Sequence, residues 1–181
     1  MADVKSTNPV FDNPPVVETV LGVQFARLQG LTSGHLGWFW KAYLDASWEK
    51  VVDAYALPDV SENFETPVGG IGIQLGPVPL PQRFQISQPN TGRMIQVQPT
   101  RFHYNWNRVD GDYPHYKSVR EEFERHFGAF CRFSQEAGLG TIRQNQWELA
   151  YIDSIPRGSL WDTIADWHGV LPGLFARPQA V

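Results

Sequence analysis

Five side chains that can form hydrogen bonds alternate with mostly apolar ones between positions 93 and 106. They are Gln96, Gln98, Arg101, His103 and Asn105. Amides and a guanidinium can bind planar or anionic ligands through paired hydrogen bonds, so this row could form a binding site. The same row would also fit a solvated sheet face, or a face that another domain or subunit covers.

A histidine and a glutamate form the best pair for acid–base chemistry. His103 and Glu148 could act together if their two strands were neighbours. No nucleophile or metal-ligand set accompanies them, so a hydrogen bond across the sheet is the favoured interpretation. Cys131, the only cysteine, lies among phenylalanines, where a buried structural thiol is expected. We therefore predict no catalytic residue, no metal site and no cofactor.

The composition restricts the class of protein. The chain has 181 residues, of which 42% are hydrophobic and 19% charged, which suits one globular domain with its own core. The net charge of −4 argues against nucleic acid as a partner, because phosphate binding requires an excess of lysine and arginine. Neither an apolar signal core nor a run long enough to span a membrane is present, so a cytoplasmic protein is expected.

The alternation that carries the polar row predicts one long strand over residues 93–106. Its apolar set changes phase once, so we expect a β-bulge at Pro99–Thr100 that brings both parts of this set to one face. The apolar set comprises Ile95, Val97, Phe102, Tyr104 and Trp106. Because these rings share the phase of the apolar side and the chain is acidic, we expect them in the core rather than on an RNA-binding surface.

Other segments show the periodicity of strands and helices. Strands are expected at 16–28, 83–87 and 142–155, with a turn at 88–92. Helices are expected from Thr32 or Ser33 to about Tyr55, from Tyr113–Pro114 to a left-handed cap at Gly138, and over 159–168 behind a capping box at Ser159–Asp162. Residues 57–82 are rich in proline and glycine and should form an irregular loop, with a short edge strand at 71–75. Gly22 within the first strand suggests a close backbone approach or a bend.

This order of elements predicts an α+β fold. We expect a ferredoxin-like βαββαβ sandwich, with a mainly antiparallel sheet and helices on one face. Residues 1–15 would be an extended lead-in, 16–156 a single α+β domain, and 157–181 a short helix and tail or the start of a second half. The helices would cover the apolar face, and no segment of this chain is expected to cover the polar face.

A set of short segments forms a combined pattern over most of residues 13–156. The segments are Asn13–Glu18, Leu21–Phe25, Ile95–Gln98, Arg101–Phe102, Asn105–Trp106, Tyr113–Tyr116, Glu148 and Tyr151–Ile155. Their combination resembles a family of sporadically distributed bacterial proteins with no assigned function. Typical members are longer and have a further α+β portion, so the resemblance implies either a short member or a chain that ends inside its second half. It implies no reaction, cofactor or substrate, but the patchy occurrence is similar to that of mobile defence or toxin–antitoxin genes.

These observations favour a non-enzymatic binding or assembly module. The expected partner is a protein chain or a second copy, as in a homo-oligomer, within a bacterial defence or toxin–antitoxin type system. The expected binding residues are Gln96, Gln98, Arg101, His103, Asn105 and Glu148. The alternative is an enzyme or small-ligand receptor with a pocket between the polar strand face and residues 57–82. Single-strand nucleic-acid binding is a weaker third option.

Overall fold

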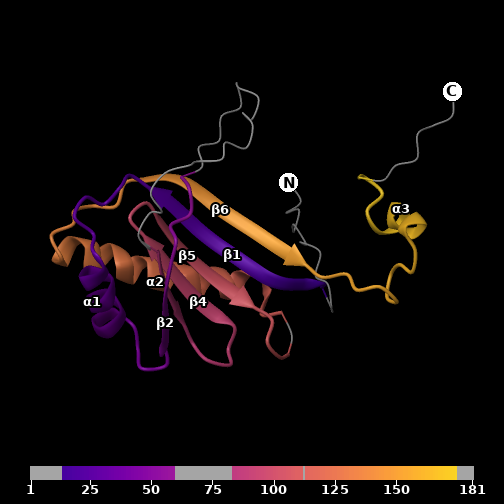
Figure 1. Cartoon of the computed structure of the whole chain (residues 1–181), viewed down its shortest axis with the longest axis horizontal. Coiled ribbons are helices and arrows are strands. Elements are labelled where there is room, and N and C mark those ends of the chain that lie inside the picture. The colour runs from indigo at the N-terminus through magenta and orange to yellow at the C-terminus, as the bar shows by residue number, and fades with distance from the viewer. Residues whose placement is uncertain (1–13, 60–82, 112, 175–181) are drawn as a thin grey trace, which may run out of the picture.

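One open antiparallel sheet forms the centre of the protein. The computed structural model describes residues 14–59, 83–111 and 113–174 (Figure 1). The sheet has six strands in the order β2-β3-β4-β5-β1-β6. In chain order they are β1 (Val16–Phe25), β2 (Lys50–Ala54), β3 (Arg83–Ser87), β4 (Arg93–Gln98), β5 (Arg101–Asn107) and β6 (Gln144–Asp153).

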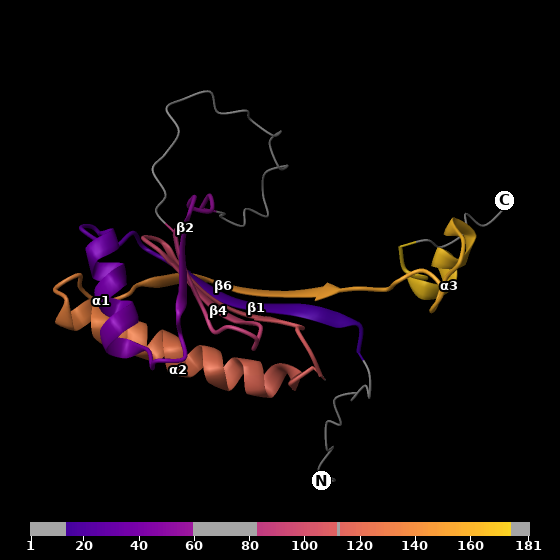
Figure 2. The same cartoon turned by 60° about the horizontal axis from the view of Figure 1, so that its bottom comes forward.

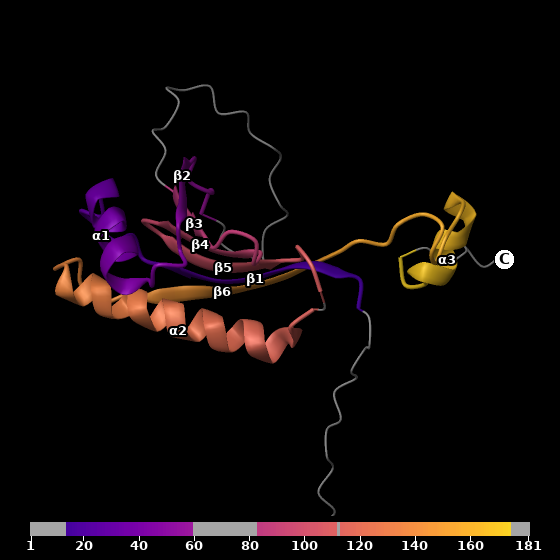
Figure 3. The same cartoon turned by 90° about the horizontal axis from the view of Figure 1, so that it is seen from below.

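Two helices cover one face of this sheet. Helices α1 (Ser33–Tyr43) and α2 (His115–Glu136) lie on the same side of the strands (Figures 2 and 3). After β6 the chain leads away from the sheet to a short 3₁₀ turn (Ile164–Asp166) and helix α3 (Trp167–Val170). In the described part of the chain, none of the helices is both long enough and apolar enough to span a bilayer.

The α+β class and the antiparallel sheet are confirmed, but the ferredoxin-like strand order is not found. A βαββαβ unit has four strands, whereas this sheet has six. Strand β1 lies between β5 and β6, and β2 lies at the opposite edge from β6. The two additional strands come from segments that the sequence patterns assigned otherwise: half of a supposed long strand, and the end of a supposed long helix.

The expected bulge near Pro99 is a complete reversal of the chain. Strand β4 ends at Gln98 and β5 begins at Arg101, and these two residues pair across a hairpin whose turn is residues 99–100. Proline suits such a turn because its φ is fixed and it has no N–H for a strand ladder. Paired residues of the hairpin share a face, so Val97 opposes Phe102 on the helix side. The single long strand is therefore wrong, while the sorting of its apolar side chains onto one face is confirmed.

The first helix is shorter than the pattern predicted. Thr32 caps it as expected, accepting a hydrogen bond from the His35 backbone N–H. The helix ends at Tyr43, and residues 50–54 instead form β2, which pairs with β3. This segment contains two adjacent valines, which favour a strand when a partner strand is available.

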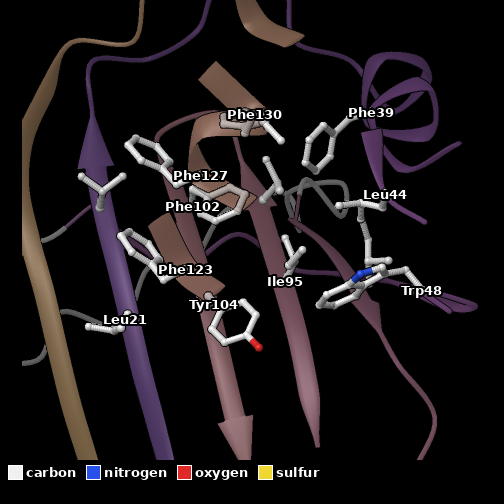
Figure 4. Close-up of a cluster of buried hydrophobic side chains, with 14 of the residues drawn as sticks. Leu21, Phe39, Leu44, Trp48, Ile95, Phe102, Tyr104, Phe123, Phe127 and Phe130 are labelled. Atoms are coloured by element: carbon white, nitrogen blue, oxygen red, sulfur yellow. The ribbon is translucent and has the colours of Figure 1, made fainter. Parts of the chain in front are cut away.

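Helix α2 packs against the apolar face of the sheet and ends at the predicted cap. Gly138 has a φ of +71°, the left-handed conformation expected there. The rings of the helix meet those of the sheet, and Phe102 of β5 stacks on Phe130 at 5.4 Å between ring centroids. Figure 4 shows Phe102 and Tyr104 among Phe123, Phe127 and Phe130 of α2. The apolar residues predicted for the core do lie in the core.

The C-terminal part differs from prediction at its helix. The capping box lies at Thr163–Asp166, where the aspartate accepts from the Thr163 backbone N–H, and not at Ser159–Asp162. The helical turns consequently begin at Ile164. The predicted strand at 71–75 and most of the predicted lead-in lie outside the described residues.

Candidate functional site

The predicted binding residues share the sheet face that lies opposite α1 and α2. This polar face takes two side chains from β4, three from β5 and one from β6: Gln96, Gln98, Arg101, His103, Asn105 and Glu148. The five side chains of the β4–β5 hairpin are all buried, with relative exposures between 2 and 8%. The row therefore is not an open solvated face.

His103 and Glu148 meet although their strands are not neighbours. Strand β1 lies between β5 and β6, and its Gly22 pairs with His103 on one side and with Glu148 on the other. A Cβ atom on Gly22 would come within 2.1 Å of His103 Cδ2, so the imidazole ring occupies the space that a side chain would fill. From there His103 Nε2 lies 2.7 Å from Glu148 Oε2. The group that approaches Gly22 is therefore a side chain, the His103 ring, and not the backbone that the sequence led us to expect.

Arg101 completes the charged part of the polar face. Its Nε lies 3.1 Å from Glu148 Oε1 in an ion pair that lacks hydrogen-bond geometry. Its Nη2 donates to Gln24 Oε1 at 2.6 Å and to the Pro58 carbonyl at 3.2 Å. The hydrogen bond with His103 lowers the pKa of Glu148, and the charge of Arg101 adds to this effect against the opposing effect of burial. Glu148 is therefore a carboxylate at neutral pH, and His103 Nε2 is the donor to it.

A chain of amides links four strands on the same face. Gln85 donates to Gln96 at 3.0 Å, Gln96 donates to Asn105 at 2.8 Å, and Asn105 donates to the Glu18 carboxylate at 2.7 Å. Because the Asn105 amide nitrogen donates to Glu18, its amide oxygen is left to accept from Gln96, and this fixes the orientation of both amides. These amides satisfy one another and join β3, β4, β5 and β1.

Part of this face is covered by the chain itself, contrary to prediction. The Gln98 side chain accepts from the Leu57 backbone N–H and donates to the Leu57 carbonyl, each at 2.9 Å. The Thr100 hydroxyl donates to Asp59. Beside these contacts is a hollow of about 300 Å³ lined by Arg27, Ala56, Leu57, Pro58, Asp59, Gln98, Pro99 and Thr100. Arg101, His103 and Glu148 do not line this hollow, and most of the 57–82 loop, which the enzyme or receptor alternative places over the polar face, lies outside the described residues.

A second, partly buried polar group lies on the helix side, where the sequence patterns did not indicate one. Arg93 Nε and Nη2 donate to the two oxygens of Glu122 at 2.7 and 2.9 Å, and the Tyr104 hydroxyl also donates to Glu122. Burial raises the pKa of Glu122, but the hydrogen bonds from Arg93 and Tyr104 outweigh it and leave the pKa below its usual value. The ring of His126 stacks on Tyr104, and burial lowers the pKa of His126 to about 4. These hydrogen bonds and ring contacts connect α2 to the β4–β5 hairpin.

Strand β6 carries exposed apolar side chains. Alternation along the strand places Trp147, Leu149 and Tyr151 on one side, and these residues are 63, 53 and 44% exposed. Ile152, on the opposite side, is 46% exposed. We call these four residues the edge patch. Strand β6 is the last strand of the sheet and lies at its outer margin in Figure 1.

The described residues do not hold the elements of a metal site. Over residues 14–59, 83–111 and 113–174, no group of three His, Cys, Asp or Glu side chains could hold a metal ion. Cys131 is half-buried, and burial raises the pKa of its thiol, which disfavours the reactive thiolate. The protein thus has a hydrogen-bonded network on the polar face of its sheet and exposed apolar side chains on the edge strand β6.

Comparisons of this chain with protein-family models, with curated proteins and with solved structures found no match. The resemblance to the sporadically distributed bacterial family therefore stays a prediction, and the function has to be argued from the geometry.

Proposed function

We propose that this chain is a non-enzymatic binding or assembly module whose partner is a protein chain. The observation that carries the proposal is the edge patch, in which two aromatic and two aliphatic side chains stand exposed on one edge strand. Open strand edges bind other chains readily, and tryptophan and tyrosine supply much of the energy at protein interfaces. Apolar residues grouped in this way are typical of an interaction surface.

The state of the polar face supports a non-enzymatic role. A general acid or base has to reach a substrate proton, directly or through one water molecule. His103 is 6% exposed and already bonded to Glu148, and Arg101 is 5% exposed with three partners. Buried polar groups that satisfy one another in this way define the structure of a core.

The proposal is tested by measuring association of the purified chain and of two matched variants. Leu149→Ser removes an exposed leucine from the edge patch, and Ile164→Ser removes an equally apolar, 84% exposed residue from the C-terminal segment. We expect light scattering to show an oligomer, or a stoichiometric protein partner, that is lost with Leu149→Ser and kept with Ile164→Ser. A monomer without any partner, or equal behaviour of the two variants, would contradict the proposal.

The biological setting is proposed from the resemblance alone. A bacterial defence or toxin–antitoxin type system would supply a dedicated partner encoded nearby. We expect the product of a neighbouring gene to bind the wild-type chain and to lose binding with Leu149→Ser. If none of the neighbouring products binds, this setting is wrong, although a partner encoded elsewhere would still fit a binding module.

A small-ligand receptor is a second candidate, favoured by the hollow between residues 56–59 and the β4–β5 turn. Its polar lining includes Gln98 and Thr100, whose side chains already bond Leu57 and Asp59. Titration of acetate or phosphate, followed by NMR, would shift the amide signals of Leu57, Asp59 and Thr100 if this hollow binds anions. Unchanged signals at millimolar concentrations would leave the hollow without a role in anion binding.

A further inference from the structure

Strand β6 has few of the features that usually protect the edge of a sheet. Natural edge strands are short, or carry lysine, proline or a bulge that hinders pairing with another chain. Strand β6 has ten residues and contains no lysine, proline or glycine. Its pairing with β1 is regular from Gln146 to Ile152, with irregularities only near the ends. No strand of the described part of the chain pairs with its outer side.

The sequence of β6 is nearly symmetric about Leu149. Two positions away on either side are aromatic residues, Trp147 and Tyr151, which project to the same face as Leu149. In an antiparallel pair centred on Leu149, Trp147 of each copy would oppose Tyr151 of the other, and the two leucines would oppose each other. Aromatic pairs directly across two strands stabilise a sheet.

The charged residues select this register over its neighbours. With Leu149 at the centre, Glu148 opposes Ala150 and no two like charges face each other. Centring the pair on Glu148 would place the two Glu148 carboxylates opposite each other, which is unfavourable. Centring it on Ala150 would place Trp147 opposite Asp153 and lose the aromatic pairs.

We propose that β6 pairs antiparallel with β6 of a second copy of this chain, about a two-fold axis at Leu149. The inference rests on the proposed binding function and names the partner. The axis would stand perpendicular to the sheet, so the two six-stranded sheets would continue into one, with the helices of both copies on the same side. Such an interface is self-complementary and closed, and it covers the edge patch of both copies at once.

Disulfide cross-linking tests both the pairing and its register. In a Cys131→Ser background, Leu149→Cys would place two thiols on the axis, and mild oxidation should give a covalent dimer. Gln146→Cys is the matched control, because residue 146 would oppose Ile152 and lie about 20 Å from its own copy. It should not cross-link alone, but a mixture of the Gln146→Cys and Ile152→Cys chains should. Cross-linking of Gln146→Cys alone as efficient as that of Leu149→Cys would overturn the register.

Light scattering of the non-cysteine variant Leu149→Lys distinguishes the failure of this inference from the failure of the proposed function. Two lysines on the axis would repel, so we expect the wild-type dimer to become a monomer while the unfolding midpoint at low protein concentration stays close to that of the wild type. A wild-type monomer that loses a different protein partner on Leu149→Lys would overturn the dimer and leave the binding function intact. If no association of any kind depends on Leu149, both are wrong.

Discussion

The polar face and the edge patch reverse the usual relation between polarity and exposure. The hydrogen-bonding side chains of the β4–β5 hairpin are at most 8% exposed, whereas the four apolar residues of the edge patch are at least 44% exposed. Polar groups can be buried here because nearly all of them have partners across the strands. Apolar groups stay exposed because, within the part of the chain that the structure describes, β6 has a neighbouring strand on one side only. Position in the sheet, rather than residue type, decides exposure in these two regions.

The largest loss of stability is expected from Gly22→Ala, which would disrupt the contact that His103 makes with Glu148 across β1. The added Cβ would overlap the His103 ring and force it away from Glu148. We expect a loss of about 3 kcal/mol or more in the free energy of unfolding, measured by urea denaturation. In a His103→Ala background the ring is absent, so the same substitution should cost much less.

A second glycine provides the control for that experiment. Gly128 lies inside α2, and a Cβ there would meet only Arg132 Nη1 at an ordinary 3.8 Å. Gly128→Ala should therefore stabilise the protein by roughly 0.5–1 kcal/mol, since glycine is a poor helix former. If Gly22→Ala were equally harmless, the His103 ring would not lie across β1.

Arg101→Ala should show that the polar face is structural. It would leave the Glu148 carboxylate, which is 24% exposed, without its ion-pair partner, and it would remove two further hydrogen bonds. We expect a loss of about 2–3 kcal/mol in the free energy of unfolding, less than for a fully buried pair. Association through the edge patch should be retained by the folded fraction. Weaker association at unchanged stability would instead place the binding surface on the polar face.

Acid should lower the free energy of unfolding by protonating groups in the buried polar clusters, without acting on the apolar edge patch directly. An unfolded His126 takes up a proton below about pH 6.5, whereas the folded residue stays neutral until about pH 4 because it is buried. Its contribution to stability is thus complete above pH 6.5 and is lost as the pH falls to 4, by at most about 3 kcal/mol. Glu148, whose pKa is lowered mainly by its hydrogen bond with His103, loses its contribution in the same direction once the pH falls below the usual pKa of a glutamate.

The pH dependence is measured as the urea midpoint between pH 7 and pH 4, with His126→Phe as the comparison. Phenylalanine keeps a ring against Tyr104 and Trp48 but cannot titrate. We expect the variant to lose less stability than the wild type over this range. Equal losses in the two proteins would show that another group controls the acid sensitivity.

The smallest change in stability is expected at the edge patch. Ile152→Ser alters a side chain that is 46% exposed, so the free energy of unfolding of the monomer should change by less than about 1 kcal/mol. Association should weaken, because this residue belongs to the proposed interface. A stability loss as large as that of Arg101→Ala would mean that the patch is part of the core.

Sequence alternation predicted the faces of strands well, because it depends only on local geometry. It placed Ile95, Val97 and Phe102 on the core side and Gln96 and His103 opposite them, as the structure has them. It did so even though the segment is a hairpin and not one strand, because the turn preserves the sorting. The expected left-handed cap at Gly138 depends on local conformation in the same way.

The features that were missed depend on contacts distant in sequence. Residues 50–54 form a strand because β3, about thirty residues later, provides a partner. The meeting of His103 and Glu148 depends on β1 lying between their strands, which no local pattern reveals. Alternation also shows which residues share a face, but not how far a helix covers that face at the margin of the sheet, where Trp147 touches Phe123 and Phe127 of α2 and is still 63% exposed. Trp147 and Leu149 were therefore indistinguishable from core residues in the sequence.

Hydrogen–deuterium exchange of the whole chain at two protein concentrations, about a hundredfold apart, compares both regions in one measurement. We expect slow exchange of the β5 amides at both concentrations, because the polar face is a buried part of the sheet. The outward amides of β6 should exchange rapidly at the lower concentration and become protected at the higher one, because a second copy then pairs with them. Rapid exchange in β5, or exchange in β6 that is the same at both concentrations, would contradict this expectation.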